Sequence, residues 1–499
     1  MPVFKGTQTH PELFQIHIGP DFGTNNLVKY CETQSSVYLR NQETLEKTLL
    51  TLCPRELWPI DSNSCMSPRP ILVVKEHQEQ LSELNAALTA AVSDIVDRWW
   101  TEKEARFPER MPLEKKEEEL LRVLAENSCA EPGAPMEIFQ ITEINARFPF
   151  NGLLHQAYGQ DALGMIEDRH NCLTAGTNTG KVNFGLQSCN TDISFSHLYQ
   201  VLNGLLSLFR HNLPLHFLKG EEPGLDIHMV VDFVQRQIGL SPRLTSPQDL
   251  RLLPDPHKEG KHTLCCLVDH DQAVTSSLFT PEGEAVEEVY QLGLELHQHE
   301  LDAMQPEILQ QVSLRCFNDL RTILLVHDKR MLGIVKEELD HLVARNVLSP
   351  TQAQALDRRI ADTFLPGSGY LDKVLYLSKV SPEIRNQFFL KPVRGGKGAG
   401  IVFGDEYEPD QWVSILKRLQ SPTLGKGGTY VVQRRITPRL YDVVLKASGE
   451  RTRYPLVGTY HAIHGQLIGF GVWRCSPHRI CTISMGGSWT CTVMQESIE

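Results

Sequence analysis

Apolar and polar positions recur along this chain with two different periods. Helical spacing of apolar residues covers 81–100, 227–238 and 284–301, and it resumes after Lys329. Short apolar runs that are typical of β-strands lie at 215–218, 243–245, 263–268, 322–326, 388–390, 401–403 and 429–436. Residues 456–474 have the pattern of a β-hairpin that turns at His464-Gly465. Because strands and helices alternate between about 214 and 300, we predict a small parallel-sheet domain there.

One stretch combines a lysine with clustered glycines. The run Phe388-Phe389-Leu390 ends in Lys391, and Gly395, Gly396, Gly398 and Gly400 precede the next apolar run, 401–403. This order predicts a strand, a glycine-rich flap and a second strand. Glycines let backbone N–H groups approach phosphate oxygens closely, and a neighbouring lysine adds positive charge. Phosphate binding explains both features, whereas a plain hairpin turn explains the glycines alone.

Two familiar phosphate-binding loops do not fit this stretch. A P-loop opens a helix, whereas the residues after Gly400 are β-formers. The segment 176–182 comes nearer to a P-loop, but it is one residue short and has Val182 where the metal-binding hydroxyl belongs. A Rossmann fingerprint also needs a helix after its glycines. The flap at 395–400 is therefore of another kind.

Two further segments carry candidate ligands. Glu143 and Asn145 lie two residues apart, so in a strand over 136–148 their side chains share one face. Their oxygens suit Mg²⁺, but a structural pairing of Glu143 with Arg147 is the stronger interpretation of the residues alone. Lys329 stands between the predicted strand 322–326 and a helix, whose N-terminus favours anions. In isolation, an ordinary loop lysine is the simpler explanation.

Composition excludes several classes of protein. The 499 residues suffice for about three domains. A net charge of −12, from 49 basic and 61 acidic residues, disfavours nucleic acid as a partner. The 12 cysteines include no Cys-x-x-Cys pair, which is typical of reduced thiols. No secretory signal and no apolar stretch of 18 residues are present, so we expect a cytoplasmic protein without a membrane partner.

These segments, in this order, resemble the ATP-grasp carboxylate–amine ligases, and most closely their glutathionylspermidine-synthase-like branch. The motifs that carry the resemblance span about 140 to 475 and are Glu143-Ile144-Asn145-Ala146, Asp328-Lys329-Arg330-Met331-Leu332, the flap Lys391 to Gly398, Tyr430 to Gln433, and Gly469 to Arg474. The family also has an Arg-x-Asp-Phe segment about a dozen residues before the Glu-x-Asn motif. Here that zone is Glu131-Pro132-Gly133-Ala134, so one part of the metal site departs from the pattern. No amidase domain is evident.

The resemblance implies an α/β protein with an ATP-grasp fold, in which antiparallel sheets sandwich ATP and a Rossmann-like parallel α/β substrate domain is inserted. It implies three parts: residues 1–150 ending in the metal-binding strand, an inserted domain at 151–305, and a nucleotide-binding region at 306–499. The implied reaction joins a small carboxylic acid to an amine through an acyl phosphate and releases ADP. A homodimer is possible. A non-catalytic nucleotide-binding module and a small-molecule kinase are the alternatives.

The resemblance also assigns roles to individual residues. Glu143 and Asn145 would bind Mg²⁺, and Arg474 would act with Glu143 in catalysis by stabilising charge on the transferring phosphoryl group. Gln433 would hydrogen-bond the adenine edge. The remaining ATP-binding residues would be Lys329, Lys391, Arg394, Gly395, Gly396, Lys397 and Gly398.

Overall fold

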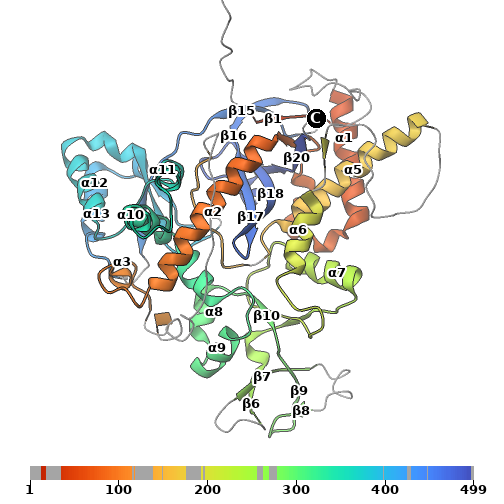
Figure 1. Ribbon diagram of the computed structural model, residues 1–499. Helices are drawn as coiled ribbons and strands as arrows, with labels where there is room; N and C mark the ends of the chain where they lie inside the picture. The colour runs from red at the N-terminus through yellow and green to blue at the C-terminus, as the bar shows by residue number, and fades with distance from the viewer. Residues whose placement is uncertain are drawn as a thin grey trace, which may run out of the picture.

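The computed structural model describes residues 13–17, 35–114, 117–118, 139–148, 150–175, 193–194, 197–255, 262–268, 278–396, 398–423, 429–446 and 448–495. These residues form a mixed α/β protein, in which helices and several separate sheets surround a hairpin near the centre (Figure 1). Among them, no helix is both long and apolar enough to cross a membrane. The cysteines whose side chains the structure describes are free thiols: Cys53, Cys65, Cys265, Cys266, Cys316, Cys475, Cys481 and Cys491.

One antiparallel sheet carries the glycine-rich flap. Its strands, in spatial order, are β11 (Thr363–Phe364), β14 (Tyr430–Arg434), β12 (Phe388–Pro392) and β13 (Val402–Phe403). On one face, Phe388, Leu390 and Val432 share a hydrophobic core with residues of α12 (Gly369–Val380) and α13 (Pro409–Arg418). The other face is turned toward residues 139–148. The predicted order of strand, flap and strand is confirmed.

A largely helical layer lies beside this sheet. Apolar side chains of α2 (Lys75–Arg98), α10 (Arg330–Ala344) and α11 (Pro350–Arg359) share one hydrophobic core. The short helix α3 (Phe107–Arg110) contributes Phe107, which stacks on Trp99 with ring centroids 5.3 Å apart. This layer fixes the start of α10, and therefore the position of Lys329, against the flap-bearing sheet.

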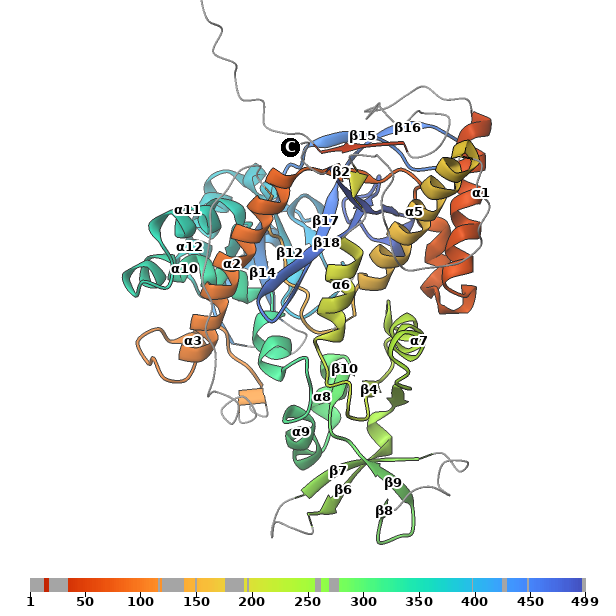
Figure 2. The same ribbon diagram turned by 45° about the vertical axis from the view of Figure 1, so that its right-hand side comes forward.

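A parallel sheet lies farther from the flap. Its order is β10 (Leu292–Glu295), β4 (His216–Lys219) and β5 (Arg243–Thr245), and α7 (Ile227–Ile238) connects β4 to β5. An antiparallel sheet projects beyond it (Figure 2), with the order β6 (Leu250–Pro254), β7 (His262–Leu267), β9 (Ala285–Glu288) and β8 (Leu278–Phe279). The strands predicted at 215–218 and 243–245 are confirmed as parallel neighbours. The strand predicted at 263–268 is formed as β7, but it belongs to the antiparallel sheet, so its place in a parallel sheet is wrong. The assignment of this region to a Rossmann-like substrate domain stays a prediction.

The remaining sheets join the two ends of the described chain. The predicted hairpin is confirmed as β17 (Val457–Ile463) and β18 (Gln466–Cys475), with β19 (Ser488–Thr490) beside β18. His464 and Gly465, both at positive φ, form its turn. The other strands are β15 (Leu440–Val444) with β16 (Arg451–Pro455), and the sheet of β1 (Phe14–Gln15), β2 (Ile71–Val73), β20 (Thr492–Gln495) and β3 (Ile193–Ser194). Further helices are α1 (Ser35–Leu52), α5 (Leu153–Ala175), α6 (His197–Leu206), α8 (Gln298–Ala303) and α9 (Pro306–Ser313).

The helix predicted over 284–301 is wrong. This stretch forms β9, β10 and the first turn of α8. All four residues of β10 are buried, so the strand lacks the alternation that would identify it. The buried Val286, Val289, Leu292 and Leu296 are spaced three or four residues apart, which imitates a helical period.

Two other predicted strands are not formed. Residues 322–326 are a helical turn that leads into α10, because Ile323, Leu324 and Leu325 are all buried in the same core. An apolar run of this length does not distinguish a strand from a buried helical segment. Residues 139–148 have no regular secondary structure apart from one isolated parallel bridge from Ile141 to Ile360. The P-loop-like segment 176–182, Lys397 and Glu131 to Ala134 lie outside the described residues.

Candidate functional site

Glu143 lies between two lysines that come from different parts of the chain. Its Oε2 is 2.7 Å from Nζ of Lys391 on β12 and 3.5 Å from Nζ of Lys329 at the start of α10. Asn145 donates from Nδ2 to Oε1 of Glu143 at 2.9 Å. Burial alone would raise the pKa of Glu143, but Lys329 and Lys391 outweigh burial and hold that pKa well below its usual range. Glu143 is therefore an ionised carboxylate held by lysines, and its predicted pairing with Arg147 is wrong.

The register of β12 and β14 places Lys391 and Gln433 on the same face of the sheet. Phe389 lies opposite Gln433 and Lys391 opposite Val431, and residues two apart in a strand point the same way. Both side chains donate to the carbonyl oxygen of Thr142, each at 3.2 Å. Thus two strands of the sheet and the 139–148 segment meet at one point.

Gln433 has an unused acceptor at this point. Its Nε2 also donates to Oγ1 of Thr363 on β11 at 2.8 Å, which fixes the orientation of the carboxamide. The side chain is buried, and its Oε1 has no hydrogen-bond partner among the described residues. A buried acceptor without a partner costs free energy unless a ligand supplies the donor.

The backbone N–H of Lys329 fixes its position, and its ammonium group makes only the 3.5 Å ion pair with Glu143 among the described residues. Its N–H donates to the carbonyl oxygen of Val393, which ties the start of α10 to the base of the flap (2.9 Å). The residue is 3% exposed, and its Nζ makes no hydrogen bond within the described structure. Burial, opposed by Glu143 and assisted by Lys391, lowers the pKa of Lys329. A nearly buried ammonium with spare donors suits an anionic ligand.

Two arginines, Arg394 and Arg147, make hydrogen bonds and ion pairs that fix the base of the flap. Arg394 makes a bidentate ion pair with Glu117 (2.7 and 2.8 Å) and lies 3.4 Å from Oδ2 of Asp328. Arg147 donates from Nη2 to the carbonyl oxygen of Arg394 (3.0 Å), while its buried Nε has no partner among the described residues. Because Arg394 is already paired with two carboxylates, it positions the flap rather than presenting a free cation.

The glycines of the flap differ in what they require. Gly398 and Gly400 have φ of +77° and +74°, a region that L-residues rarely adopt. Gly398 also touches the side chain of Ile480, whereas a Cβ on Gly396 would meet nothing within 4 Å. Thus Gly396 leaves open space above the flap backbone, and Gly398 allows close contact between the flap and the loop after β18.

The electrostatic balance of the region favours an anion. Burial, Lys329 and Arg147 lower the pKa of His327 to about 3, so its ring is neutral and Nδ1 accepts from the N–H of Ala146 (3.3 Å). Among the described residues, five cations face four carboxylates: Lys329, Lys391, Arg147, Arg330 and Arg394 against Glu117, Glu143, Asp302 and Asp328. Buried excess charge of this kind needs a counter-ion.

Arg474 lies at some distance along the chain from this cluster. It is on β18, opposite Val457 and Trp489, and is partly buried with an unpartnered Nε. None of the described contacts joins it to Glu143 or to either lysine. It lies close enough to Cys481 to influence the pKa of that thiol, and Ile480 beside it touches Gly398. The predicted catalytic role of Arg474 therefore stays a prediction.

Several residues of the cluster were missed in the sequence. Glu117 belongs to the charged stretch 114–119, a pattern that is typical of a solvated helix face, yet it is 3% exposed and binds Arg394. Asp328 and Arg330 pair with each other at 2.8 Å beneath Lys329. Both residues belong to the motif Asp328 to Leu332, in which a carboxylate and a guanidinium two positions apart could have indicated their pairing.

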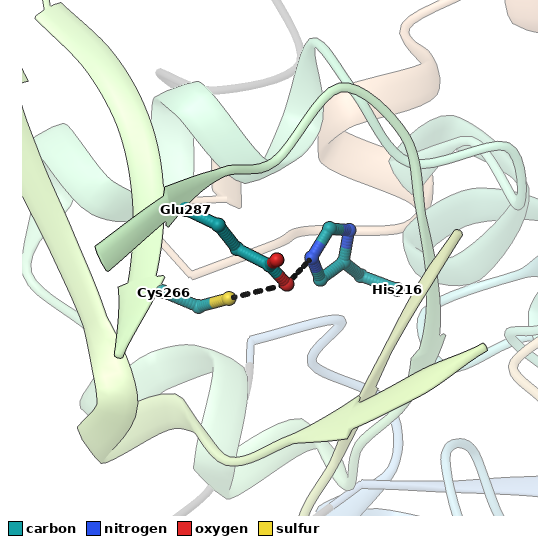
Figure 3. Close-up of side chains that lie close together, drawn as sticks. All are labelled: His216, Cys266 and Glu287. Carbon is teal, nitrogen blue, oxygen red and sulfur yellow. Dashed lines mark hydrogen bonds and ion pairs between the residues drawn. The ribbon is translucent and has the colours of Figure 1, made fainter. Parts of the chain in front are cut away.

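A second polar cluster joins the parallel and antiparallel sheets. His216 on β4 and Cys266 on β7 both point to Oε1 of Glu287 on β9, as Figure 3 shows, at 2.8 and 3.8 Å. These residue types can bind a transition metal. However, Nε of Arg243 is also 2.7 Å from the same oxygen and supplies the positive charge. We therefore interpret this cluster as a structural ion-pair and hydrogen-bond contact between the two sheets.

Comparison with known proteins identifies the family. A family model described as the AnkG N-terminal domain matches residues 84–325. The ATP-grasp enzyme ankG of Aspergillus thermomutatus is 34% identical over 431 residues, which is 83% of this chain and 86% of that protein. A solved apo structure of a glutathione synthetase like-effector from Globodera pallida covers 93% of this chain and 99% of its own, at 12% identity and a TM-score of 0.47. By its sequence relationship to ankG, this chain belongs to the ATP-grasp enzymes.

Proposed function

We propose that this protein is an ATP-dependent ligase that joins a carboxylic acid to an amine through an acyl phosphate. The observation that carries the proposal is the buried ammonium of Lys329, which lies beside Lys391 and the flap with no hydrogen bond of its own. A phosphate group would supply the acceptors that this ammonium lacks. Membership of the ATP-grasp enzymes makes ATP the natural source of that phosphate.

The described residues fit the parts of ATP. Lys329 and Lys391 would hold its phosphates, and the open space above Gly396 allows the flap backbone to cover them. The unpartnered Oε1 of Gln433 would accept a hydrogen bond from the adenine amino group. Thr363 and Thr142 keep the Gln433 carboxamide in the orientation that leaves this oxygen available.

The site also fits Mg²⁺. Glu143 is ionised and about one third exposed (32%), and the Oδ1 of Asn145 is free to accept because Nδ2 makes the bond to Glu143. One or two protein oxygens together with phosphates and water are a common Mg²⁺ environment. When bound there, the ion would neutralise part of the phosphate charge. Phosphate and metal would take over the interactions that Glu143 and the lysines now make with each other.

The reaction would use these residues to bind and orient rather than to form covalent bonds with substrate. A substrate carboxylate oxygen attacks the γ-phosphorus, the bond to the β-phosphate oxygen breaks, and ADP leaves. Lys329 and Lys391 stabilise the charge on the transferring group, and Arg474 would do so from β18. An amine then attacks the acyl carbon, the C–N bond forms, and inorganic phosphate leaves with the former carboxylate oxygen.

Oxygen tracing tests this proposal against its alternatives. A panel of ¹⁸O-labelled carboxylic acids is offered with ATP, Mg²⁺ and hydroxylamine, and hydroxamate and labelled phosphate are measured. The ligase predicts both products, with ¹⁸O in the phosphate. A kinase that acts on a hydroxyl group gives ADP without labelled phosphate, and a non-catalytic module binds ATP without forming ADP. Either of these results would refute the ligase. Glu143→Gln protein prepared in parallel controls for contaminating ATPases.

A further inference from the structure

Two cross-strand pairs of side chains meet between the parallel sheet and the antiparallel sheet that projects beyond it. His216 on β4 lies directly opposite Arg243 on β5 in the parallel register. Cys266 on β7 lies directly opposite Glu287 on β9 in the antiparallel register. Figure 3 shows His216, Cys266 and Glu287 pointing toward one another. Because all four residues belong to paired strands, the backbone fixes their relative positions more precisely than a loop does.

The three donor atoms of this group have the types and separations that a small tetrahedral metal site needs. Nε2 of His216, Sγ of Cys266 and a carboxylate oxygen of Glu287 all lie within 4.8 Å of one another. Around a tetrahedral Zn²⁺, nitrogen and oxygen ligands are about 3.3 Å apart, and sulfur and oxygen ligands are about 3.6 Å apart. The separations from Oε1 of Glu287 are 2.8 Å to the nitrogen and 3.8 Å to the sulfur. Side-chain shifts of about 0.5 Å therefore admit the ion.

A cation already contacts this carboxylate in the structure, and it is the guanidinium of Arg243. Its Nε lies 2.7 Å from Oε1 of Glu287. Arg243 is partly exposed on β5, which is an edge strand of its sheet, so the guanidinium can turn toward solvent. The ion pair accounts for the charges of Arg243 and Glu287, but it gives no role to the buried thiol of Cys266.

Exchange of this guanidinium for Zn²⁺ keeps the buried charge at zero. Burial is the main reason that the pKa of the Cys266 thiol rises to about 12, so without a metal the thiol is neutral. Zn²⁺ adds two positive charges, and the thiol loses one proton as its sulfur becomes a ligand. The thiolate and the carboxylate of Glu287 then carry the two negative charges that balance the ion. An interior that accommodates the present ion pair therefore accommodates the metal as well.

The donor types also select the metal. A thiolate and an imidazole favour Zn²⁺ over Mg²⁺ and Ca²⁺, which prefer oxygen ligands. His216 and Cys266 are buried, whereas the side chain of Glu287 is 31% exposed, so the ion reaches the site from the side of the carboxylate. Nδ1 of His216 has no hydrogen-bond partner among the described residues, so it can carry the ring proton while Nε2 binds the metal. Water from the open side completes the four ligands.

We propose that His216, Cys266 and Glu287 form a Zn²⁺ site that fixes the antiparallel sheet against the parallel sheet. The site is separate from the cluster around Glu143 and does not depend on the proposed ligase function. On binding, the Cys266 thiol releases its proton to solvent and the ion pair between Arg243 and Glu287 breaks. Bonds then form from the ion to Nε2, Sγ and a carboxylate oxygen. Because these ligands come from both sheets, the metal stabilises the packing of the sheets and hence the folded protein.

Metal titration with matched variants provides the first test. Full-length protein with no polyhistidine tag is stripped with a chelator and titrated with Zn²⁺ in competition with a chromophoric chelator. We expect one strongly bound ion per chain, with its affinity lowered at least about tenfold in Cys266→Ser and in Glu287→Gln. Cys265→Ser and Glu288→Gln are the controls, because each residue faces the opposite side of its strand, and both should keep the parental affinity. A parent protein without a stoichiometric ion, or parental affinity in folded Cys266→Ser protein, would overturn the assignment.

Cobalt substitution and removal of the competing cation provide the second test. When Co²⁺ replaces Zn²⁺, a thiolate ligand gives an intense charge-transfer band in the near ultraviolet. This band should be present in the parent and in Cys265→Ser, and absent in Cys266→Ser. Arg243→Met should bind Zn²⁺ at least about tenfold more tightly than the parent, and Zn²⁺ should raise its melting temperature, because no guanidinium competes for Glu287. A band that persists in Cys266→Ser, or an Arg243→Met protein that Zn²⁺ does not stabilise, would contradict the assignment and leave an ion-pair contact alone.

Discussion

Replacing Lys391 with methionine should weaken nucleotide binding while leaving the fold intact. Methionine keeps most of the length and the apolar part of this side chain, which is 8% exposed. The change removes an ammonium that would contact phosphate and that now lies 2.7 Å from Glu143. Loss of one charge-assisted contact is worth ~1.5–3 kcal/mol, or about ten- to one-hundredfold in affinity.

When Mg²⁺ is present, we expect a loss of nucleotide affinity in the lower half of that range. In the parent protein, Lys391 must give up its short contact with Glu143 before it binds phosphate, and the variant avoids this cost. Without metal, the loss should be larger, because Glu143 would then face the phosphates with only Lys329, at 3.5 Å, to balance it. The Mg²⁺ dependence of the affinity is therefore as informative as its value.

Isothermal titration with ADP and a non-hydrolysable ATP analogue, with and without Mg²⁺, measures both effects. Lys379→Met, on the exposed side of α12, is the matched control for loss of a lysine. A melting temperature within a few degrees of the parent value shows that the fold is retained. Parental affinity in folded Lys391→Met protein would exclude this cluster as the phosphate site.

Three further predictions use the same structure. Glu143→Gln should bind metal-free ADP more tightly, since two lysines lose their counter-charge, yet should lose nearly all turnover; parental turnover would place the metal elsewhere. Gly398→Ala should raise the KM for ATP several-fold, because its φ of +77° costs a side chain ~1–2 kcal/mol, while Gly396→Ala should be tolerated. Burial is the main reason that the pKa of Glu295 rises from about 4.3 in the unfolded chain to about 8 in the folded protein. The stabilisation of the folded state that this difference gives is complete below pH ~4.3 and is lost as the pH rises through about 8. The melting temperature of Glu295→Gln relative to the parent should therefore increase between pH 5 and 9 (roughly 2 °C or more), and a pH-independent difference would contradict the raised pKa.

The sequence predicted the flap and its flanking strands because local chemistry determines them. Lys391 ends an apolar run and glycines follow, and only a strand and a glycine-rich turn accommodate both. Five residues of the motifs that resemble those of ATP-grasp enzymes meet in the structure: Glu143, Asn145, Lys329, Lys391 and Gln433. Their meeting depends on sheet register and on the start of α10, which residue spacing alone does not reveal.

Long-range partners account for what the sequence did not predict. Glu117 resembled a solvated residue because its partner, Arg394, is 277 residues away. Residues 284–301 resembled a helix because β10 is covered on both faces and shows no alternation. No sequence pattern indicated Glu295, because its distinguishing feature is a buried oxygen that has no hydrogen-bond partner among the described residues.

Because β2 pairs with β20, this sheet cannot finish folding until residues 492–495 have been synthesised. Thr490 donates to the carbonyl oxygen of Arg69 across 421 residues, and the indole of Trp489 donates to Ser62 in the core that also contains α1 and α5 residues. At typical translation rates, these partners emerge on the order of 20–80 s after β2 does. Until then, β2 has an open edge and the Trp489 site is unfilled, so the first-made helices expose apolar surface to the cell. Molecular chaperones are therefore expected to bind the growing chain, and the amino-terminal half should not accumulate as a stable fragment.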